Sequence, residues 1–329
     1  MNLDKKQKEV LHMDVFRTDR IRNVVLLGHS GSGKTSLTEA MAYLSGMTNR
    51  LGKVTDGNTV SDFDKEEIKR KCSISTTLVP VVWGKNKINV LDTPGMFDFV
   101  GEAQEAASAA DAAVIVVSGK AGVQVGTQKA WELCEKYNLP RMIFVTEMDQ
   151  DDVSYREVVE QLTELYGKRI APLHMPLREN GKFVGYINIV KNKGRRYIEK
   201  DKKEECPIPD YSVEYLEKYR ETLMESVAET SEEFMDRYFG GEEFSVAEIS
   251  AALAMNVGDG TIVPVCMGSP AYRTFWMISA DTSRIRPPVR VPASISIRTK
   301  FSRQITTSRN RRARPFSRRS WIRSLENIQ

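Results

Sequence analysis

Short apolar runs alternate with helix-length amphipathic segments along the first half of the chain. The strand-like runs cover residues 23–27, 88–91, 112–117 and 142–145, and the helix-like segments between them cover residues 34–44, 102–109 and 128–137. Strands separated by helix-length segments predict a parallel sheet covered by helices on both faces. The last strand-like run, residues 262–265, follows only after a long insertion. We therefore expect an α/β fold that carries an inserted segment.

The insertion combines several kinds of structure. It begins with a helix-like stretch, continues with a β-like part at residues 182–189, and ends with an acid-rich helical stretch at residues 212–239. Apolar residues recur at helical spacing along that stretch, at Tyr215, Tyr219, Leu223, Val227, Phe234 and Tyr238. We expect one face of the stretch to pack against the main domain, while its acidic side is either solvated or a partner surface.

These patterns divide the chain into four parts. Residues 1–17 form a flexible extension and residues 154–256 form the inserted α+β subdomain, and the main domain takes residues 18–153 and 257–270. Residues 271–329 form an irregular basic tail without helical or strand periodicity. Two folded units are thus expected, which suits a chain of 329 residues.

Composition places the protein among soluble globular proteins, with 41% hydrophobic and 28% charged residues. The N-terminal residues lack the apolar stretch of a secretory signal, and no apolar run is long enough to span a bilayer. Four scattered cysteines without a CxxC pair argue against a zinc cluster or a disulfide framework. We expect a cytoplasmic protein without a membrane partner.

The charge is distributed unevenly along the chain. Residues 271–329 contain fourteen Lys or Arg against two acidic residues, whereas the first 270 residues are net acidic. Such a tail is an arginine-rich arm that contacts RNA phosphates, an unstructured neutral tail, or a segment read out of frame in a truncated gene. Codons for residues 321–328 can be chosen so that a shifted frame encodes VDPFIGKY, and this favours the out-of-frame interpretation.

One motif carries a strong chemical signal. Residues 28–35 read GHSGSGKT and match GxxxxGK[ST] between a strand-like run and a helix-like segment. Glycines at these spacings let backbone N–H groups turn toward phosphates, and the following helix points its positive end at them. Lys34 then contacts the β- and γ-phosphates, and the Thr35 hydroxyl coordinates Mg²⁺.

Two further segments follow the expected strands. Asp92 begins DTPG at the end of a strand, where its carboxylate holds Mg²⁺ through water and the Gly95 N–H approaches the γ-phosphate. Asp149 follows another strand and accepts hydrogen bonds from guanine N1–H and N2–H. Gly268 and Ser269, after the last strand, supply backbone donors to the base carbonyl.

Taken together, these blocks resemble the GTPase domain of elongation factor G and its relatives, including the tetracycline-resistance ribosomal protection proteins. The resemblance covers residues 18–270 and includes GHSGSGKTS, DFDKEEIKRKCSIS, DTPGMFDFV and AETSEEFMDRYFGGEEF. It implies a P-loop GTPase fold, a mainly parallel sheet flanked by helices, with an inserted α+β subdomain. The nucleotide-binding positions that it implies are Gly28, His29, Ser30, Gly31, Ser32, Gly33, Lys34, Thr35, Ser36, Asp92, Thr93, Pro94, Gly95, Thr146, Glu147, Asp149, Gly268 and Ser269.

The same resemblance implies GTP or GDP with Mg²⁺ as cofactors and the ribosome as partner. The acidic helices at residues 212–239 face the ribosomal stalk in that family, so they are a candidate partner surface here. Lys34, Gly95 and Met96 occupy the catalytic positions. We expect a monomer with no specific DNA partner, and no translocation by this polypeptide alone.

Three departures from the family pattern limit the expected activity. Ser73 stands where the first switch has a Mg²⁺-binding threonine, and Met96 replaces the histidine that orients the attacking water. Loss of such a group costs about 100- to 10,000-fold in rate. The family's NKxD becomes Thr146-Glu147-Met148-Asp149. In the family the asparagine amide hydrogen-bonds the N7 edge of the base and ties loops together, and the shorter threonine is not expected to replace both functions. The chain is therefore either a slow ribosome-associated GTPase or a nucleotide-binding module that has lost catalysis.

Overall fold

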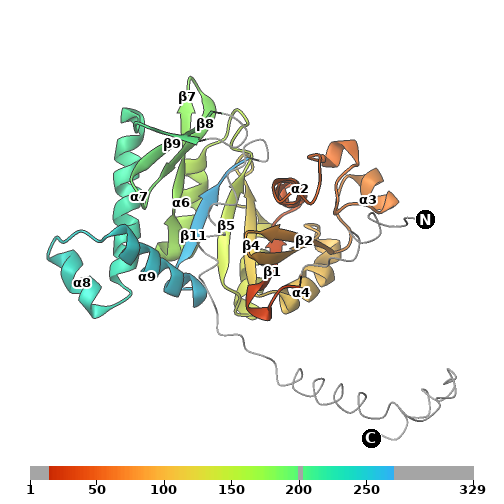
Figure 1. The fold of residues 1–329 in the computed structure, drawn as a ribbon, viewed down its shortest axis with the longest axis horizontal. Helices are drawn as coiled ribbons and strands as arrows, with labels where there is room; N and C mark the ends of the chain where they lie inside the picture. Colours follow the sequence, from red (N-terminus) through yellow and green to blue (C-terminus); the bar gives the residue numbers. More distant parts are fainter. Residues whose placement is uncertain (1–14, 199–202, 270–329) are drawn as a thin grey trace, which may run out of the picture. The chain divides into compact units, whose positions relative to one another are not determined.

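The computed structural model describes residues 15–198 and 203–269, all within one compact unit (Figure 1). Its centre is a seven-stranded sheet in the order β2-β3-β1-β4-β5-β11-β6. Every neighbouring pair is parallel except β2 and β3. The strands are β1 (Ile21–Leu27), β2 (Thr77–Trp83), β3 (Asn86–Asp92), β4 (Ala112–Ser118), β5 (Arg141–Thr146), β6 (Ile170–Pro172) and β11 (Val263–Met267).

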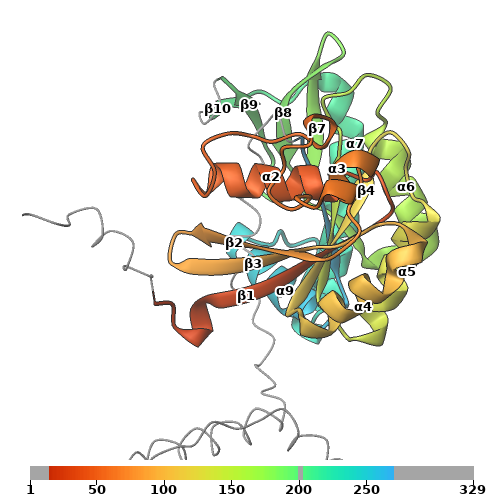
Figure 2. The same cartoon turned by 90° about the vertical axis from the view of Figure 1, so that its right-hand side faces the viewer.

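Helices cover both faces of this sheet, as the alternating pattern predicts. Figure 2 shows α2 on one side of strands β1 to β3 and α4 on the other. The helices of this part are α2 (Lys34–Leu44), α3 (Lys65–Arg70), α4 (Val100–Ala109), α5 (Val125–Lys136), α6 (Tyr155–Tyr166) and α9 (Val246–Gly258). Short 3-10 turns are η1 (Thr18–Arg20), η2 (Val54–Asp56), η3 (Phe97–Phe99) and η4 (Gly167–Arg169).

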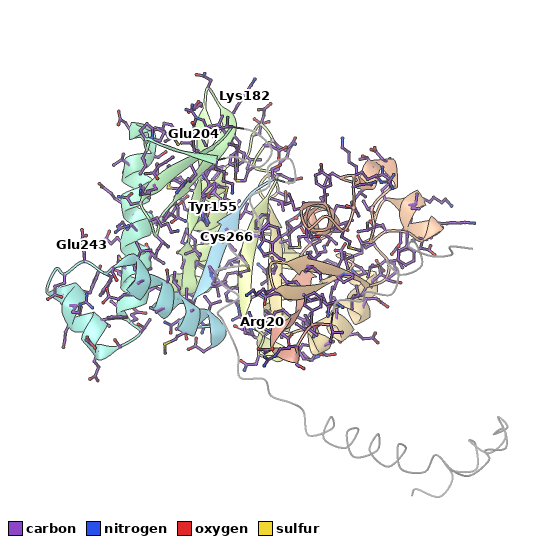
Figure 3. All side chains as sticks on the ribbon, viewed as in Figure 1. Arg20, Tyr155, Lys182, Glu204, Glu243 and Cys266 are labelled. Atoms are coloured by element: carbon purple, nitrogen blue, oxygen red, sulfur yellow. The ribbon has the colours of Figure 1, made fainter. Side chains whose placement is uncertain are left out.

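The core lies on the central strands. Every residue of β5 is buried, and β4 is buried from its second residue onward. Continuous apolar runs of this kind are typical of parallel strands covered on both faces. Tyr155 of α6 and Cys266 of β11 are both buried in the part of the core marked in Figure 3. Because β3, β1, β4, β5 and β11 run parallel, their carboxyl ends lie along one edge of the sheet, after Asp92, Leu27, Ser118, Thr146 and Met267.

The inserted segment forms a second, antiparallel sheet in the order β10-β9-β8-β7. Its strands are β7 (His174–Glu179), β8 (Lys182–Asn188), β9 (Lys193–Tyr197) and β10 (Lys203–Cys206). The main sheet nevertheless extends past residue 153, because β6 pairs in parallel with β11. The boundaries of the inserted subdomain stay a prediction.

The acid-rich stretch of the insertion is two helices instead of one. α7 (Asp210–Ala228) ends at Glu229, and α8 (Glu232–Phe239) begins where the Ser231 hydroxyl accepts a hydrogen bond from the Phe234 N–H. Serine and threonine favour such helix starts, and the sequence Thr230-Ser231 breaks the apolar periodicity here. Tyr219, Leu223 and Val227 are buried, and α7 packs against β6 of the main sheet. The other positions expected on the packed face, Tyr215, Phe234 and Tyr238, are half-buried against the core.

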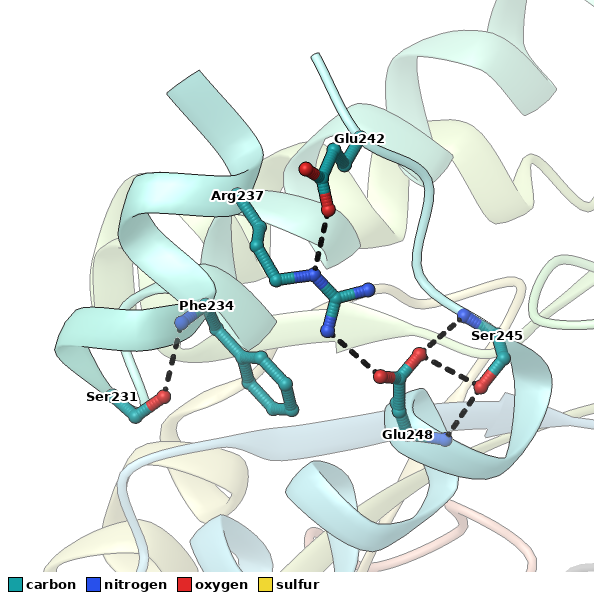
Figure 4. Close-up of polar contacts among 6 residues, drawn as sticks. All are labelled: Ser231, Phe234, Arg237, Glu242, Ser245 and Glu248. Atoms are coloured by element: carbon teal, nitrogen blue, oxygen red, sulfur yellow. Dashed lines mark hydrogen bonds and ion pairs between the residues drawn. The ribbon is translucent and has the colours of Figure 1, made fainter. Parts of the chain in front are cut away.

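One arginine ties α8 to the start of α9, as Figure 4 shows. Arg237 Nη1 lies 2.7 Å from Glu248 Oε1, and its Nε lies 3.1 Å from Glu242 Oε2. Glu248 also accepts hydrogen bonds from the backbone and hydroxyl of Ser245, which caps α9. Its hydrogen bond with Arg237, with help from Ser245, lowers the pKa of Glu248 to about 2. This network fixes a helix that has no fully buried side chain of its own.

Two expectations fall outside this description. The first fourteen residues and the basic tail from residue 270 onward lie outside the described residues. Within the described ranges, no helix is long and apolar enough to cross a membrane.

Candidate nucleotide-binding site

The loop between β1 and α2 has the backbone that the GxxxxGK[ST] pattern predicts. Gly28, Gly31 and Gly33 all have positive φ values, of 144°, 78° and 91°. A Cβ atom on Gly28 would lie 2.3 Å from the Val116 carbonyl oxygen, so no side chain fits there. The loop therefore curls tightly before α2, whose first N–H groups point at the space where phosphates bind in such loops.

Lys34 is buried within this loop, with only 6% of its surface exposed. Its Nζ donates hydrogen bonds to the carbonyls of Gly28 at 3.0 Å and His29 at 2.9 Å. Burial lowers the pKa of Lys34 to about 8, against the opposing charges of Asp92 and Asp62. A Cβ on Gly95 would lie 2.5 Å from Nζ, so Gly95 is where the DTPG segment touches the loop.

Hydroxyl and carboxylate oxygens gather beside Lys34. Thr35 Oγ1 and Ser73 Oγ lie 3.1 Å apart, although they are 38 residues apart in sequence. Ser73 donates to Asp62 Oδ1 at 2.7 Å. Asp92 is 1% exposed, and neither of its carboxylate oxygens has a hydrogen-bond partner of normal geometry. Hard oxygen ligands of this kind suit Mg²⁺.

Electrostatics agree with a cation site at this point. Burial raises the pKa of Asp92 to about 6, despite the opposing effects of Ser61, Lys34 and Thr35. Burial also raises the pKa of Asp62, whose second oxygen lacks a partner as well. A buried acid whose hydrogen bonds do not offset its burial is costly unless a positive charge compensates it. The donor set therefore fits a magnesium ion held by Thr35, Ser73 and Asp92, with Asp62 nearby.

Asp62 is the residue that sequence reasoning missed. It lies in DFDKEEIKRKCSIS, which carries family resemblance, but nothing in the pattern marked it as buried. The segment after it places Ser73: Glu67 accepts hydrogen bonds from the Ile74 and Ser75 N–H groups, and Lys71 adopts a left-handed conformation. Thr59, Ser61 and Asp62 are all buried, which only the structure reveals.

The segment predicted to recognise the base begins at the end of β5. The Thr146 hydroxyl lies 2.8 Å from the Ser32 carbonyl oxygen and 3.2 Å from the Val117 carbonyl oxygen. The Met148 N–H donates to the Gly268 carbonyl at 3.4 Å, which brings the predicted residues Gly268 and Asp149 into adjacent loops. Asp149 is exposed, whereas Ser269 is buried.

The remaining predicted positions line the same edge of the sheet. Thr93 donates to the Leu26 carbonyl at 2.6 Å, and Pro94 is buried beside it. The Ser32 hydroxyl is buried without a partner, while Ser36 is half-buried in the first turn of α2. The Ser30 N–H lies beside Gly95, and the His29 ring packs edge-on to Phe97 with centroids 5.9 Å apart.

Comparison with known proteins agrees with this geometry. The family described as "Elongation factor Tu GTP binding domain" matches residues 19–270. The chain belongs to this family. It therefore has the P-loop GTPase fold and contains the GTP-binding domain of a translational GTPase, and the resemblance seen in its motifs is confirmed.

Relatives of this GTP-binding domain are longer proteins. The chain is 31% identical over 283 residues to "Elongation factor G 1" of Syntrophomonas wolfei, covering 84% of this chain and 42% of that protein. A solved structure from Thermus thermophilus superposes with a TM-score of 0.75 at 36% identity, covering 82% of this chain and 41% of the other. The chain thus spans less than half the length of these relatives.

Two features of the GTP-binding domain depart from the family motifs. Met96, 40% exposed, precedes η3 and offers only a thioether where the family motif has a histidine. Glu147 has a φ of 63° and accepts a hydrogen bond from the Ser118 hydroxyl. Thr146 links the P-loop to the segment that follows β5 through its hydrogen bond to the Ser32 carbonyl, and its role toward the base stays a prediction.

Proposed function

We propose that the chain binds GTP and GDP together with Mg²⁺ and is the first domain of a ribosome-associated factor of the elongation factor G type. The single observation that carries the proposal is the buried Asp92 carboxylate, neither of whose oxygens has a hydrogen bond of normal geometry, in the region of Lys34 and Thr35. Nucleotide phosphates with their metal ion are the charges that this arrangement accommodates.

Each part of the site has a role in this proposal. Backbone N–H groups of residues 28–35 hold the phosphates, and Lys34 exchanges its two loop carbonyls for phosphate oxygens. The hydroxyls of Thr35 and Ser73, with Asp92, hold the metal, which when bound neutralises phosphate charge. Asp149 reads the N1–H and N2–H edge of guanine, and Gly268 and Ser269 flank it.

Hydrolysis is slow in this proposal because Met96 cannot orient water. A positioned proton acceptor at such a site contributes about 100- to 10,000-fold to a rate. The Gly95 N–H and Lys34 remain to stabilise charge on the γ-phosphate, so a low basal rate is expected. GTP binding then orders the segments around Ser73 and Met96, and slow hydrolysis releases them.

The partner and the whole protein's activity are inferred from relatives. "Elongation factor G 1" names a translation factor, and by analogy this chain acts on the ribosome in the cytoplasm. The exposed acidic residues of α7 and α8 are then the surface for the ribosomal stalk, at residues 212–239. A ribosomal protection factor or a separated, catalytically impaired domain is the alternative, since the chain spans 42% of that relative.

Fluorescent GDP binding tests the first part of the proposal. Wild-type protein is expected to bind GDP in a magnesium-dependent manner, Lys34→Ala to lose binding, and Asp92→Asn to lose the magnesium dependence. Lys129→Ala is the matched control, because Lys129 pairs with Glu132 on the surface of α5. Equal binding by wild type and Lys34→Ala would refute the proposal.

Measuring single-turnover GTP hydrolysis with and without ribosomes separates a ribosome-associated GTPase from a catalytically impaired nucleotide-binding module. A ribosome-associated GTPase shows stimulation by ribosomes, whereas a nucleotide-binding module binds GDP with no stimulated turnover.

A further inference from the structure

An arginine of the inserted sheet reaches into the base-recognition loop. The pairing of β7 with β8 shifts register between Leu177 and Arg178, which marks a bulge at the end of β7. Bulges of this kind redirect a side chain and are common beside functional sites. Lys182, at the start of β8, marks this end of the hairpin in Figure 3.

The redirected side chain binds three backbone carbonyls. Arg178 Nη2 donates to the Met148 carbonyl at 3.1 Å and to the Val153 carbonyl at 3.3 Å, while Nη1 donates to Gly181 at 2.9 Å. Met148 directly precedes Asp149, and Val153 ends the same loop. A charged donor to a carbonyl is stronger than a neutral one, and the planar guanidinium fixes the geometry of both contacts.

The backbone of Arg178 is itself held from α7. The Tyr211 hydroxyl accepts from the Arg178 N–H at 3.0 Å and donates to the Arg178 carbonyl at 2.6 Å. Tyr211 lies in the first turn of α7, the helix that begins the acid-rich stretch. A continuous set of hydrogen bonds thus runs from α7 through Arg178 to the loop that carries Asp149.

We propose that Arg178, held by Tyr211, positions Asp149 for guanine recognition and links the inserted subdomain to nucleotide affinity. This inference rests on the proposed guanine-nucleotide binding. Thr146 fixes the start of the loop through Ser32 and Val117, but it lies three residues before Asp149. Arg178 restrains the two carbonyls on either side of the acid.

The consequence is specific for the base. Asp149 meets the N1–H and N2–H groups of guanine, and inosine lacks the N2 amino group. A misplaced Asp149 therefore weakens GDP binding more than IDP binding, whereas damage to the phosphate site weakens both equally. The ratio of the two affinities separates a positioning role from a general structural one.

The experiment measures GDP and IDP binding by the full chain and its variants. Arg178→Ala is expected to weaken GDP binding about tenfold or more and IDP binding about threefold or less, in line with loss of a charged hydrogen-bond donor. Arg178→Lys keeps the positive charge and can donate to one of the two loop carbonyls, so it should retain part of the preference for GDP that Arg178→Ala loses. Tyr211→Phe removes both contacts to the Arg178 backbone and should lower the preference about two- to fivefold.

Arg195→Ala is the matched control, because Arg195 lies on β9 of the same sheet and pairs with Glu205. It is expected to keep the wild-type preference. The proposal is overturned if Arg178→Ala and Arg178→Lys retain the wild-type GDP-to-IDP ratio, if both nucleotides weaken equally, or if Arg195→Ala gives the same loss. Failure of the wild type to bind either nucleotide would instead refute the proposed function on which this inference depends.

Discussion

Thr146→Val tests how the P-loop and the base loop are joined. Thr146 is only 1% exposed, and its hydroxyl lies 2.8 Å from the Ser32 carbonyl oxygen. Valine has nearly the same shape, so the substitution removes the hydrogen bond without opening a cavity. A buried carbonyl left without its donor costs about 1–3 kcal/mol. The weaker contact to Val117, at 3.2 Å, adds to this in the same direction.

Urea unfolding of the variant gives the magnitude directly. We expect Thr146→Val to lower the free energy of unfolding by about 1–3 kcal/mol and to weaken GDP binding about tenfold, because Ser32 belongs to the phosphate loop. Thr222→Val is the matched control: its hydroxyl donates to the Lys218 carbonyl on the solvent side of α7. That change is expected to stay within about 0.5 kcal/mol of the wild type.

The opposite substitution sharpens the test. Thr146→Asn restores the residue of the family motif, whose longer amide is expected to contact both the Ser32 carbonyl and the base. It is expected to tighten GDP binding without loss of stability. The reasoning is wrong if Thr146→Val unfolds at the same urea concentration as Thr222→Val. It is also wrong if Thr146→Asn binds GDP more weakly than the wild type.

Two further outcomes follow from the same structure. Met96→His is expected to raise the single-turnover rate of GTP hydrolysis about 100-fold or more. Met96→Leu is the control and is expected to leave that rate unchanged. Equal rates in both variants would show that the lack of a water-orienting group does not limit turnover. Burial lowers the pKa of His174 from 6.5 to about 3, and the facing charges of Lys203 and Lys191 act in the same direction. The unfolded chain therefore binds a proton that the fold excludes, and His174 alone contributes a loss of stability that approaches about 1.4 kcal/mol per pH unit between pH 6.5 and about pH 3. The raised pKa of Asp92 acts in the opposite direction, so the effect of His174 is the difference between the wild type and the variant. His174→Gln should flatten this slope in urea titrations between pH 7 and 5, and an unchanged slope would contradict it.

The main sheet could be predicted because its central strands are buried on both faces. Such strands appear as continuous apolar runs, as residues 112–117 and 142–145 do, and they stand out without knowledge of their neighbours. The edge strands were harder. β2 contains Pro80 and alternates between buried and exposed positions, and β6 has only three residues. Their membership in the sheet depends on pairing partners far away in the sequence.

The tight backbone of the loop at residues 28–35 could also be predicted, because the spacing of glycines within one short segment determines it. The contacts of Asp62, Arg178 and Thr146 depend on tertiary structure. Asp62 meets Ser73 across a helix, and Arg178 reaches Met148 through a bulge that no local pattern reveals. The contact of Thr146 with the Ser32 carbonyl oxygen could not be predicted, because the position of that carbonyl relative to a short side chain cannot be derived from local sequence.

The two halves of the site therefore differ in how they depend on the rest of the fold. In the proposed site, Lys34 and Thr35 act through the backbone of one loop and one helix start, and the contact of Ser32 with Thr146 joins that loop to the main sheet. In the proposed site, Asp149 recognises guanine from an exposed loop that Thr146 anchors to the main sheet and Arg178 anchors to the inserted one. Loss of the asparagine and lysine of the usual base motif leaves more of the recognition to these supports. Guanine specificity in this chain should accordingly be sensitive to the inserted subdomain, while phosphate binding should not.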